Sequence, residues 1–139
     1  MRIFFDSSAF AKRYIEEPGS EKVENLSAQA TMLGVSSICL PEIISGLCRL
    51  TRDSVLTRNQ YEVTKDALLK DFEDISVCNI TPTVIGQAIH ILETNTLRTS
   101  DAIHIGCALE WQAEVFVSSD LRQISAAKKA GLKVVKVQF

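Results

Sequence analysis

The sequence predicts an α/β protein with a parallel sheet covered by helices on both faces. Short apolar runs rich in Val, Ile and Phe alternate along the chain with longer segments of helical spacing. The runs contain little polar alternation, which is typical of parallel strands that are buried on both sides. No internal repeat, low-complexity segment or long linker divides the 139 residues, so we expect one domain over residues 1–139.

The N-terminal part of the chain reads as a strand followed by two helices. Residues 2–5 form a short apolar run, which predicts a buried strand. Ser7 or Ser8 suits the N-cap of a helix that extends to about residue 15, and a proline–glycine pair then breaks the pattern. From Ser20 to about residue 30, polar and apolar residues alternate at helical spacing and predict an amphipathic helix.

The middle of the chain predicts two strands that enclose two helices. The apolar run 33–39 predicts the second strand. Pro41 fits the first position of the next helix, where its missing N–H costs nothing, and apolar residues continue at helical spacing to Leu50. A further helix is expected over 57–72, followed by a third strand over 74–80.

The C-terminal part of the chain continues the alternation. A Thr-Pro pair opens one helix, a second helix follows directly, and Gly131 ends the last helix. Two Val-rich runs supply the remaining strands. The expected helices are 82–95, 99–111 and 121–130, and the expected strands are 115–118 and 132–137.

Composition and charge exclude several classes of protein. The net charge is −2, so no global basic field is present to hold duplex DNA nonspecifically. A nuclease that relies on metal ions and a local basic rim stays compatible with this charge. No apolar stretch is long enough to span a bilayer, and an acid interrupts the N-terminal apolar run well short of a signal-peptide core. We therefore expect a cytoplasmic protein without a membrane partner.

The cysteines are predicted to pack in the core. No pair has the C-x-x-C spacing that is typical of zinc or redox sites, and each cysteine lies in an apolar segment. Disulfide bonds and metal ligation are the less favoured alternatives. The cysteines are Cys39, Cys48, Cys78 and Cys107.

Four acids stand at the junctions between predicted elements. Asp6 follows the first strand and Asp120 follows the fourth, while Glu42 and Asp101 lie in the first turns of helices. Ligands of open α/β sheets bind outside the carboxyl ends of the strands, where helices that follow strands also begin. We therefore expect the four carboxylates to face one crevice. Glu42 and Asp101 can instead be acids that stabilise helix starts, and Asp120 can be a helix cap, whereas Asp6 follows three apolar residues and is less easily explained in this way.

A concentrated group of carboxylates predicts a cation. Close carboxylates repel one another and raise one another's pKa, and a divalent ion reverses that effect. Oxygen ligands favour Mg²⁺ or Mn²⁺, and no cluster of His or Cys is present to favour zinc. A carboxylate-bound ion of this type suits phosphodiester hydrolysis, because it orients the phosphate and lowers the pKa of an attacking water.

Three segments resemble the PIN domain, and within it the VapC-type ribonuclease toxins of toxin–antitoxin pairs. They are the run from Asp6 to Tyr14, the segment Pro41-Glu42-Ile43, and the run from Leu97 to His104. The stretch that ends in Ser119-Asp120 fits the last motif, although Ser119 stands where threonine is common in the family. The match covers essentially the whole chain in the order of the family, and the first and third segments are its specific parts.

The resemblance implies a fold, an activity and partners. It implies a five-stranded parallel sheet in the order 3-2-1-4-5. It also implies an endoribonuclease that depends on Mg²⁺ or Mn²⁺ and cuts single-stranded or structured RNA with a metal-activated water. Asp6, Glu42 and Asp101 correspond to the main metal-site acids of the family, and Asp120 corresponds to its more variable fourth acid. A homodimer and a cognate antitoxin protein are the implied partners. Our own candidate for the interface is the exposed face of the helix 57–72 and of its neighbouring helix.

Other polar residues near these motifs are candidates for supporting roles. Ser8 and Ser119 can hydrogen-bond a metal-ligating carboxylate or a bound water, or else serve in helix capping and turns. Lys12, Arg13 and Arg98 can contact RNA phosphates, although a solvated surface charge is the favoured reading for Lys12 and Arg13.

The two histidines are expected to be structural. His104 lies one helical turn after Asp101, where a general-base role is the less favoured alternative. His90 is surrounded in the sequence by apolar residues and is expected to pack rather than react.

Two other functions compete with the ribonuclease. A non-catalytic protein on the same scaffold would keep the acids for metal-stabilised folding or for docking a partner. A phosphotransfer domain or α/β phosphatase would need a second acid two residues after the nucleophilic Asp, but Asp6 is followed by Ser7 and Ser8. An RNA-binding module without chemistry is disfavoured because aromatic residues make up only 6% and form no stacking platform.

Overall fold

A fully parallel five-stranded sheet forms the centre of the protein. The computed structural model describes residues 1–137, so residues 138–139 of the expected domain lie outside the described residues. The strand order is β3-β2-β1-β4-β5, as the resemblance implied. The strands are β1 (Arg2–Phe5), β2 (Met32–Ser36), β3 (Ser76–Cys78), β4 (Val115–Ser118) and β5 (Lys133–Lys136).

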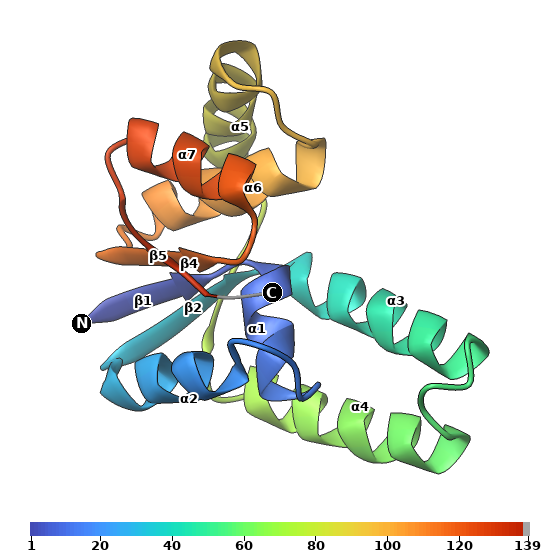
Figure 1. Cartoon of the computed structure of the whole chain (residues 1–139). Helices are drawn as coiled ribbons and strands as arrows, with labels where there is room; N and C mark the ends of the chain where they lie inside the picture. The colour runs from blue at the N-terminus through green and yellow to red at the C-terminus, as the bar shows by residue number, and fades with distance from the viewer. Residues whose placement is uncertain (138–139) are drawn as a thin grey trace.

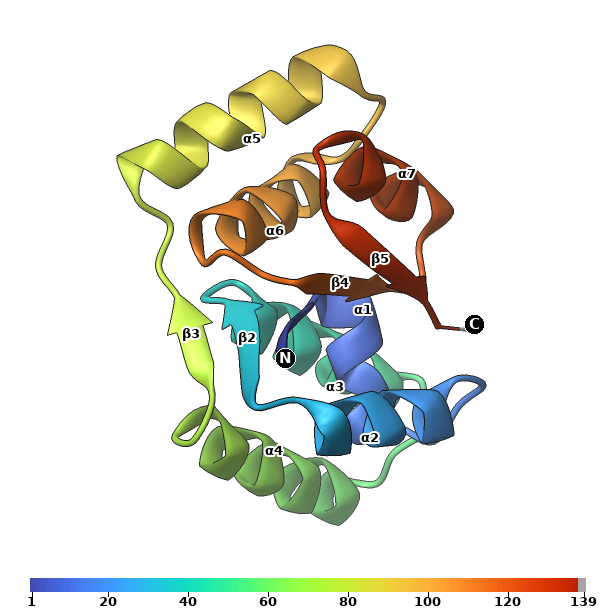
Figure 2. The ribbon, with the colours of Figure 1, turned by 90° about the vertical axis from the view of Figure 1, so that its left-hand side faces the viewer.

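Helices cover both faces of the sheet, as Figures 1 and 2 show. The structure has α1 (Ser7–Phe10), a 3₁₀ turn η1 (Ala11–Arg13), α2 (Ser20–Gln29), α3 (Cys39–Arg52), α4 (Arg58–Phe72), α5 (Pro82–Thr94), α6 (Thr99–Glu110) and α7 (Leu121–Lys129). Helices α1 to α4 lie on one side of the sheet and α5 to α7 on the other. The predicted fold class is therefore confirmed.

Strand β1 shows how the sheet divides the core in two. Ile3 and Phe5 pack into the cluster that includes residues of α1 to α4, whereas Phe4 packs into the cluster of α5 to α7. Successive side chains of a strand point to opposite faces, so a continuous apolar run fills both cores. Strand β1 pairs with β2 on one edge and with β4 on the other, which makes it the central strand.

Several predicted boundaries differ from the structure. The strand expected over 33–39 ends at Ser36, and Cys39 already lies in the first turn of α3, so Pro41 is the third helical residue rather than the first. The Ser36 hydroxyl accepts a hydrogen bond from the Ile38 N–H at 3.3 Å, which turns the chain out of the sheet. The expected third strand over 74–80 is shortened to β3.

The first helix is shorter than expected and has a different cap. Helix α1 ends at Phe10 and tightens into the 3₁₀ turn η1, so regular helix does not reach residue 15. Asp6, rather than Ser7 or Ser8, is its N-cap, and its carboxylate accepts a hydrogen bond from the Ala9 N–H at 2.8 Å. The short helix therefore begins at the acid that ends strand β1.

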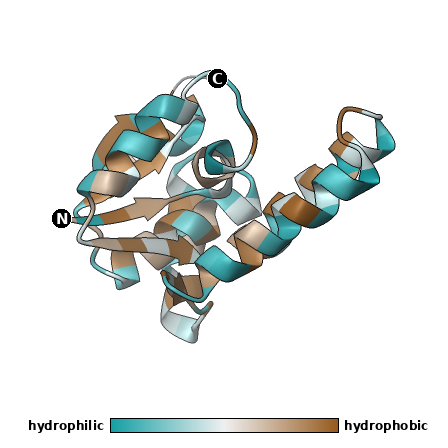
Figure 3. Ribbon diagram, turned by 90° about the horizontal axis from the view of Figure 1, so that it is seen from below, coloured by the Kyte–Doolittle hydropathy of each residue, from teal (hydrophilic) through white to brown (hydrophobic). Residues whose placement is uncertain are grey.

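Helices α3 and α4 form an arm that projects beyond the sheet (Figure 3).

Two further features bear on the expectations from composition. The cysteines are free, and each packs in or against a core cluster, which confirms the prediction of core packing. Within residues 1–137, no helix combines the length and the apolar character needed to cross a membrane.

Candidate active site

The four predicted acids line one cleft of about 480 Å³ at the carboxyl edge of the sheet. Asp6 follows β1, Asp120 follows β4, and Glu42 and Asp101 lie in the first turns of α3 and α6. The expected convergence of strand ends and helix starts is therefore present in the fold. Because α3 belongs to one helical layer and α6 to the other, the cleft lies where the two layers meet.

Asp6 is the most deeply buried of the four acids. Its side chain caps α1, receives the Ser118 hydroxyl at 2.6 Å, and lies 3.0 Å from the Ser8 hydroxyl. Burial raises the pKa of Asp6, although the hydrogen bond from Ser118 and the charge of His104 partly oppose this effect. The carboxylate is therefore held rigidly, and it forms no ion pair within residues 1–137.

Glu42 lies in a polar triangle with Ser7 and His104. Glu42 Oε1 accepts a hydrogen bond from the Ser7 hydroxyl at 2.6 Å and lies 2.6 Å from His104 Nε2. Burial alone would raise the pKa of Glu42, but the hydrogen bonds from His104 and Ser7 outweigh it and lower the pKa. These contacts hold Oε1 of Glu42, and a hydrogen bond from Ser100 also helps to lower the pKa of the carboxyl group.

His104 is buried beside the acid cleft and does not lie on the exposed surface of its helix. The side chain is 1% exposed, and its Nδ1 is buried without a hydrogen-bond partner among the described residues. The prediction of a structural histidine is compatible with this burial, but no pattern in the sequence indicated that the ring would contact Glu42. Ser7 was also missed, because its neighbour Ser8 fitted the same motif.

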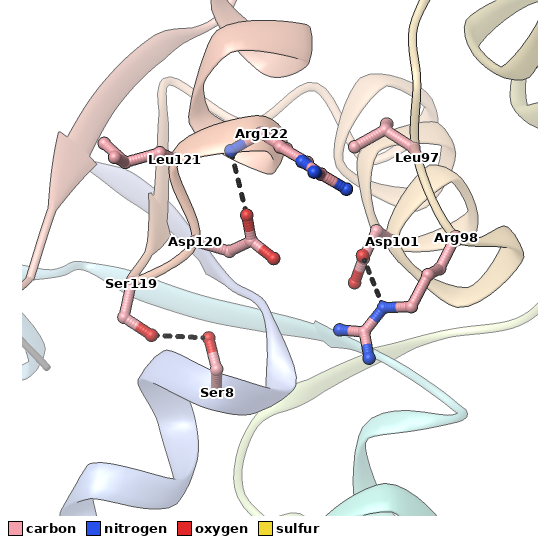
Figure 4. Close-up of a pocket in the computed structure, with 8 residues that line it drawn as sticks. All are labelled: Ser8, Leu97, Arg98, Asp101, Ser119, Asp120, Leu121 and Arg122. Carbon is pink, nitrogen blue, oxygen red and sulfur yellow. Dashed lines mark hydrogen bonds and ion pairs between the residues drawn. The ribbon is translucent and has the colours of Figure 1, made fainter.

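Asp101 faces a cation that the protein itself supplies. Its carboxylate lies 3.2 Å from the Arg98 guanidinium, which is largely exposed to solvent (Figure 4). The neighbouring Asp101 raises the pKa of Arg98, so the arginine stays charged. An exposed pair of this kind contributes little to stability and exchanges readily. Arg98 therefore lines the acid cleft as an exposed cation, and its contact with RNA phosphates stays a prediction.

Asp120 both caps a helix and lines the acid cleft, which are the two roles that the sequence left open. Its Oδ1 accepts hydrogen bonds from the Arg122 N–H at 2.8 Å and the Gln123 N–H at 3.4 Å, so it caps α7. It also lines the same cleft as the other acids. Ser119 donates a hydrogen bond to Ser8 at 2.9 Å, and this contact joins the loop after β4 to α1 (Figure 4).

Ser118 and Gln123 form a buried network that sequence reasoning missed. Gln123 is 1% exposed and its amide donates to the Asp101 carbonyl at 3.1 Å, while the Ser118 hydroxyl lies 3.2 Å from its carbonyl oxygen. The register could have indicated Ser118, because Phe5 pairs with Val117 and the residues that follow them are then neighbours. The network ties β4, α6 and α7 to the acid that ends β1.

The remaining predicted basic residues differ in position. Lys12 lines the cleft, but it is 3% exposed and its ammonium lies 3.0 Å from Glu17, so the expectation of a solvated lysine is wrong. Arg13 packs over the Phe10 ring at 5.1 Å and does not line the cleft. These contacts give Lys12 and Arg13 packing partners, and the sequence did not predict them.

The donors in the cleft fit a hard divalent cation. Within residues 1–137, no group of three or more His, Cys, Asp or Glu side chains is arranged so that it could hold a metal ion. Mg²⁺ does not require one, because it keeps several waters and uses one or two carboxylates together with substrate phosphates. The carboxylates of Asp6 and Glu42, which both line the cleft, supply oxygen ligands of the kind that such an ion prefers.

A parallel α/β sheet with an acidic crevice at the ends of β1 and β4 defines a class of protein that binds ligands at the carboxyl edge. The chain belongs to the PIN domain family, whose model matches residues 3–129.

Sequence relatives and solved structures agree with this membership. Ribonuclease VapC49 of Mycobacterium tuberculosis is 28% identical to this chain over an alignment of 143 positions, gaps included. The alignment covers 99% of this chain and 96% of the relative. A VapC20 structure from the same species, described as a sarcin–ricin loop cleaving toxin, has a TM-score of 0.70 at 17% identity and covers 96% of this chain and 98% of that one. A toxin–antitoxin complex from Klebsiella pneumoniae has a TM-score of 0.70 at 15% identity, with 96% of each chain covered. At these identities, the structural likeness shows the fold.

Proposed function

We propose that this protein is a metal-dependent endoribonuclease and the toxin component of a toxin–antitoxin pair. The observation that carries the proposal is the cleft in which Asp6, Glu42, Asp101 and Asp120 meet. Two sequence relatives, ribonucleases VapC45 and VapC49 of Mycobacterium tuberculosis, align over nearly the whole chain. Family membership and an intact acidic cleft together favour RNA cleavage over a non-catalytic scaffold.

The reaction is hydrolysis of a phosphodiester bond. The oxygen of water forms a bond to phosphorus, the bond from phosphorus to the 3′-oxygen breaks, and the leaving oxygen takes up a proton. A bound Mg²⁺ or Mn²⁺ supplies Lewis acidity, because it lowers the pKa of water and offsets the charge that develops on the phosphate. The proposed metal ligands are Asp6, Glu42, Asp101 and Asp120.

The residues around the acids serve to fix their geometry. Ser118 and Ser8 hold the carboxylate of Asp6, and His104 and Ser7 hold one oxygen of Glu42. Preorganised ligands reduce the cost of placing a substrate phosphate, because the side chains do not need to be ordered on binding.

The proposed partners are RNA, a second copy of the chain and an antitoxin protein. Solved structures with the same fold include a toxin–antitoxin complex and VapBC complexes bound to DNA. The expected homodimer interface on α4 remains a proposal, and Val63, which is exposed on this helix, supplies apolar surface for it.

The decisive experiment compares Asp6→Asn and Asp101→Asn with the wild type. RNA is incubated with each purified protein in Mg²⁺ or Mn²⁺, and the new RNA ends are sequenced. We expect both variants to lose cleavage by at least two orders of magnitude while circular dichroism shows an unchanged fold, because removing one charged ligand weakens the metal centre. Asp74→Asn, at an exposed turn before β3, is the matched control and should cleave like the wild type.

Undiminished metal-dependent cleavage by both variants would refute the assignment. A wild-type protein that binds a partner but cleaves no RNA with either metal would instead support the non-catalytic alternative.

A further inference from the structure

A second cavity of about 580 Å³ opens beside the acid cleft (Figure 4). It shares Asp101, Asp120 and the Ser8–Ser119 hydroxyl pair with the cleft and adds Leu97, Leu121 and Arg122. The volume lies within the range of roughly 300–1,000 Å³ that is typical of small-ligand sites. A ligand in this cavity therefore lies directly next to any phosphate held at the acids.

Arg122 gives the cavity a free cation. In the part of the chain that the structure describes, its guanidinium forms no ion pair or hydrogen bond, and Figure 4 shows it pointing across the cavity toward Asp101. The backbone N–H of Arg122 is bound to Asp120 at 2.8 Å, so the first turn of α7 fixes where the side chain starts. An unpaired guanidinium offers a planar set of donors that suits phosphate oxygens.

Apolar side chains form the rims of the same cavity. Leu121 is 58% exposed, although large apolar residues are usually buried, and Leu97 lies on the opposite rim (Figure 4). The hydroxyls of Ser8 and Ser119, which are bonded to each other at 2.9 Å, also line the cavity. The apolar rims suit the base of a nucleotide, the free guanidinium suits its phosphate, and the pair of hydroxyls suits its ribose.

We propose that this cavity binds the nucleotide adjacent to the scissile phosphate, with Arg122 on the neighbouring phosphate and Leu97 and Leu121 against the base. The inference rests on the proposed ribonuclease function and deepens it. Contact with a base face requires that the base is not stacked in a duplex, so the site selects unpaired RNA at this position. The acid cleft continues on the other side along α3 toward Arg49, which gives the strand a path through the acids.

The test measures RNA binding separately from cleavage. A fluorescein-labelled single-stranded RNA decamer is titrated in EDTA, and its dissociation constant is read from fluorescence anisotropy at several salt concentrations. Arg122→Gln and Leu121→Ser are compared with Arg52→Gln, which removes the same charge from an exposed position at the end of α3. A duplex of the same sequence is the second probe.

We expect Arg122→Gln to weaken single-strand binding about tenfold and to reduce the salt slope by about one unit, because one phosphate contact is lost. Leu121→Ser should weaken binding about fivefold without changing the slope, because it removes contact with a base rather than charge. Arg52→Gln should stay within about twofold of the wild type, and the duplex should bind more weakly than the single strand.

Equal affinities for Arg122→Gln and Arg52→Gln would overturn the inference, as would equal binding of duplex and single strand. Variants that keep RNA binding but lose affinity for a partner protein would also overturn it and assign the cavity to that protein. If the wild type cleaves no RNA in Mg²⁺ or Mn²⁺ but binds RNA through Arg122 and Leu121, the ribonuclease proposal fails and the nucleotide site stands.

Discussion

Asp6 shows how one residue serves both the fold and the site. It ends the central strand, caps α1, and presents a buried carboxylate to the cleft. Capping explains why an acid is tolerated at a strand end, but it uses the partial charges of backbone N–H groups rather than a full cation. The cost of burial therefore remains, and it is visible in the raised pKa of Asp6.

The raised pKa of Asp6 predicts a pH dependence of stability without metal. Between the ordinary and the raised pKa, the folded chain holds a proton that the unfolded chain has released, so the free energy of unfolding falls as pH rises. Asp6→Asn removes the buried charge and keeps a capping side chain. We expect this variant to be more stable than the wild type at neutral pH in EDTA, with the difference shrinking toward the ordinary pKa of aspartate. Urea unfolding, followed by circular dichroism at several pH values, measures this difference in the free energy of unfolding.

Glu42→Gln is the matched comparison for Asp6→Asn, because the pKa of Glu42 is lowered. A lowered pKa contributes stability above the ordinary value and loses it as pH falls. Glu42→Gln should therefore be less stable than the wild type at neutral pH. A change of the same sign in both variants would contradict the opposite environments of the two acids.

At the scale of elements, the packing of α6 against β2 depends on one glycine. Strand β2 carries Gly34 where a Cβ atom would lie 2.9 Å from the ring of Trp111. Arg2 restricts the movement of this ring. Its guanidinium carbon lies 4.0 Å from the ring centroid, and its Nη2 donates a hydrogen bond to the Trp111 carbonyl at 2.6 Å. The close approach of α6 to β2 therefore depends on the absence of a side chain at this position.

Gly34→Ala should destabilise the fold by about 1–3 kcal/mol, because the added methyl group overpacks a ring that has little room to move. Gly86→Ala is the paired control, since a Cβ atom on this glycine of α5 would meet no atom within 4 Å. It should stabilise the helix by about 0.5–1 kcal/mol. Thermal unfolding of both variants separates the two effects, and a stabilised Gly34→Ala would show that the ring yields.

For the whole molecule, the cleft lies between the two helical layers. Its acids come from both layers and from the two central strands that separate them. Carboxylates gathered at this junction repel one another across the layers. A cation bound there would add to the contact between Glu42 of α3 and His104 of α6, which already joins the two layers.

Mg²⁺ should therefore raise the melting temperature of the wild type. Binding to the folded state alone stabilises it by about 2.7 kcal/mol when the ion is present at a hundred times its dissociation constant. Asp101→Asn should lose most of this gain, whereas Asp74→Asn, at an exposed turn before β3, should keep it. Differential scanning fluorimetry with and without EDTA measures the change. An equal gain in all three proteins would place the ion elsewhere.

The sequence by itself determined the fold class, the strand order through its resemblance, and the four acids. These follow from local information, because apolar runs predict strands and acids at strand ends and helix starts share one edge. Only the tertiary structure decided the supports of those acids. Ser118, Gln123 and His104 reach the acids across long sequence separations. Contacts between distant segments depend on strand register and helix packing, which no short sequence pattern encodes.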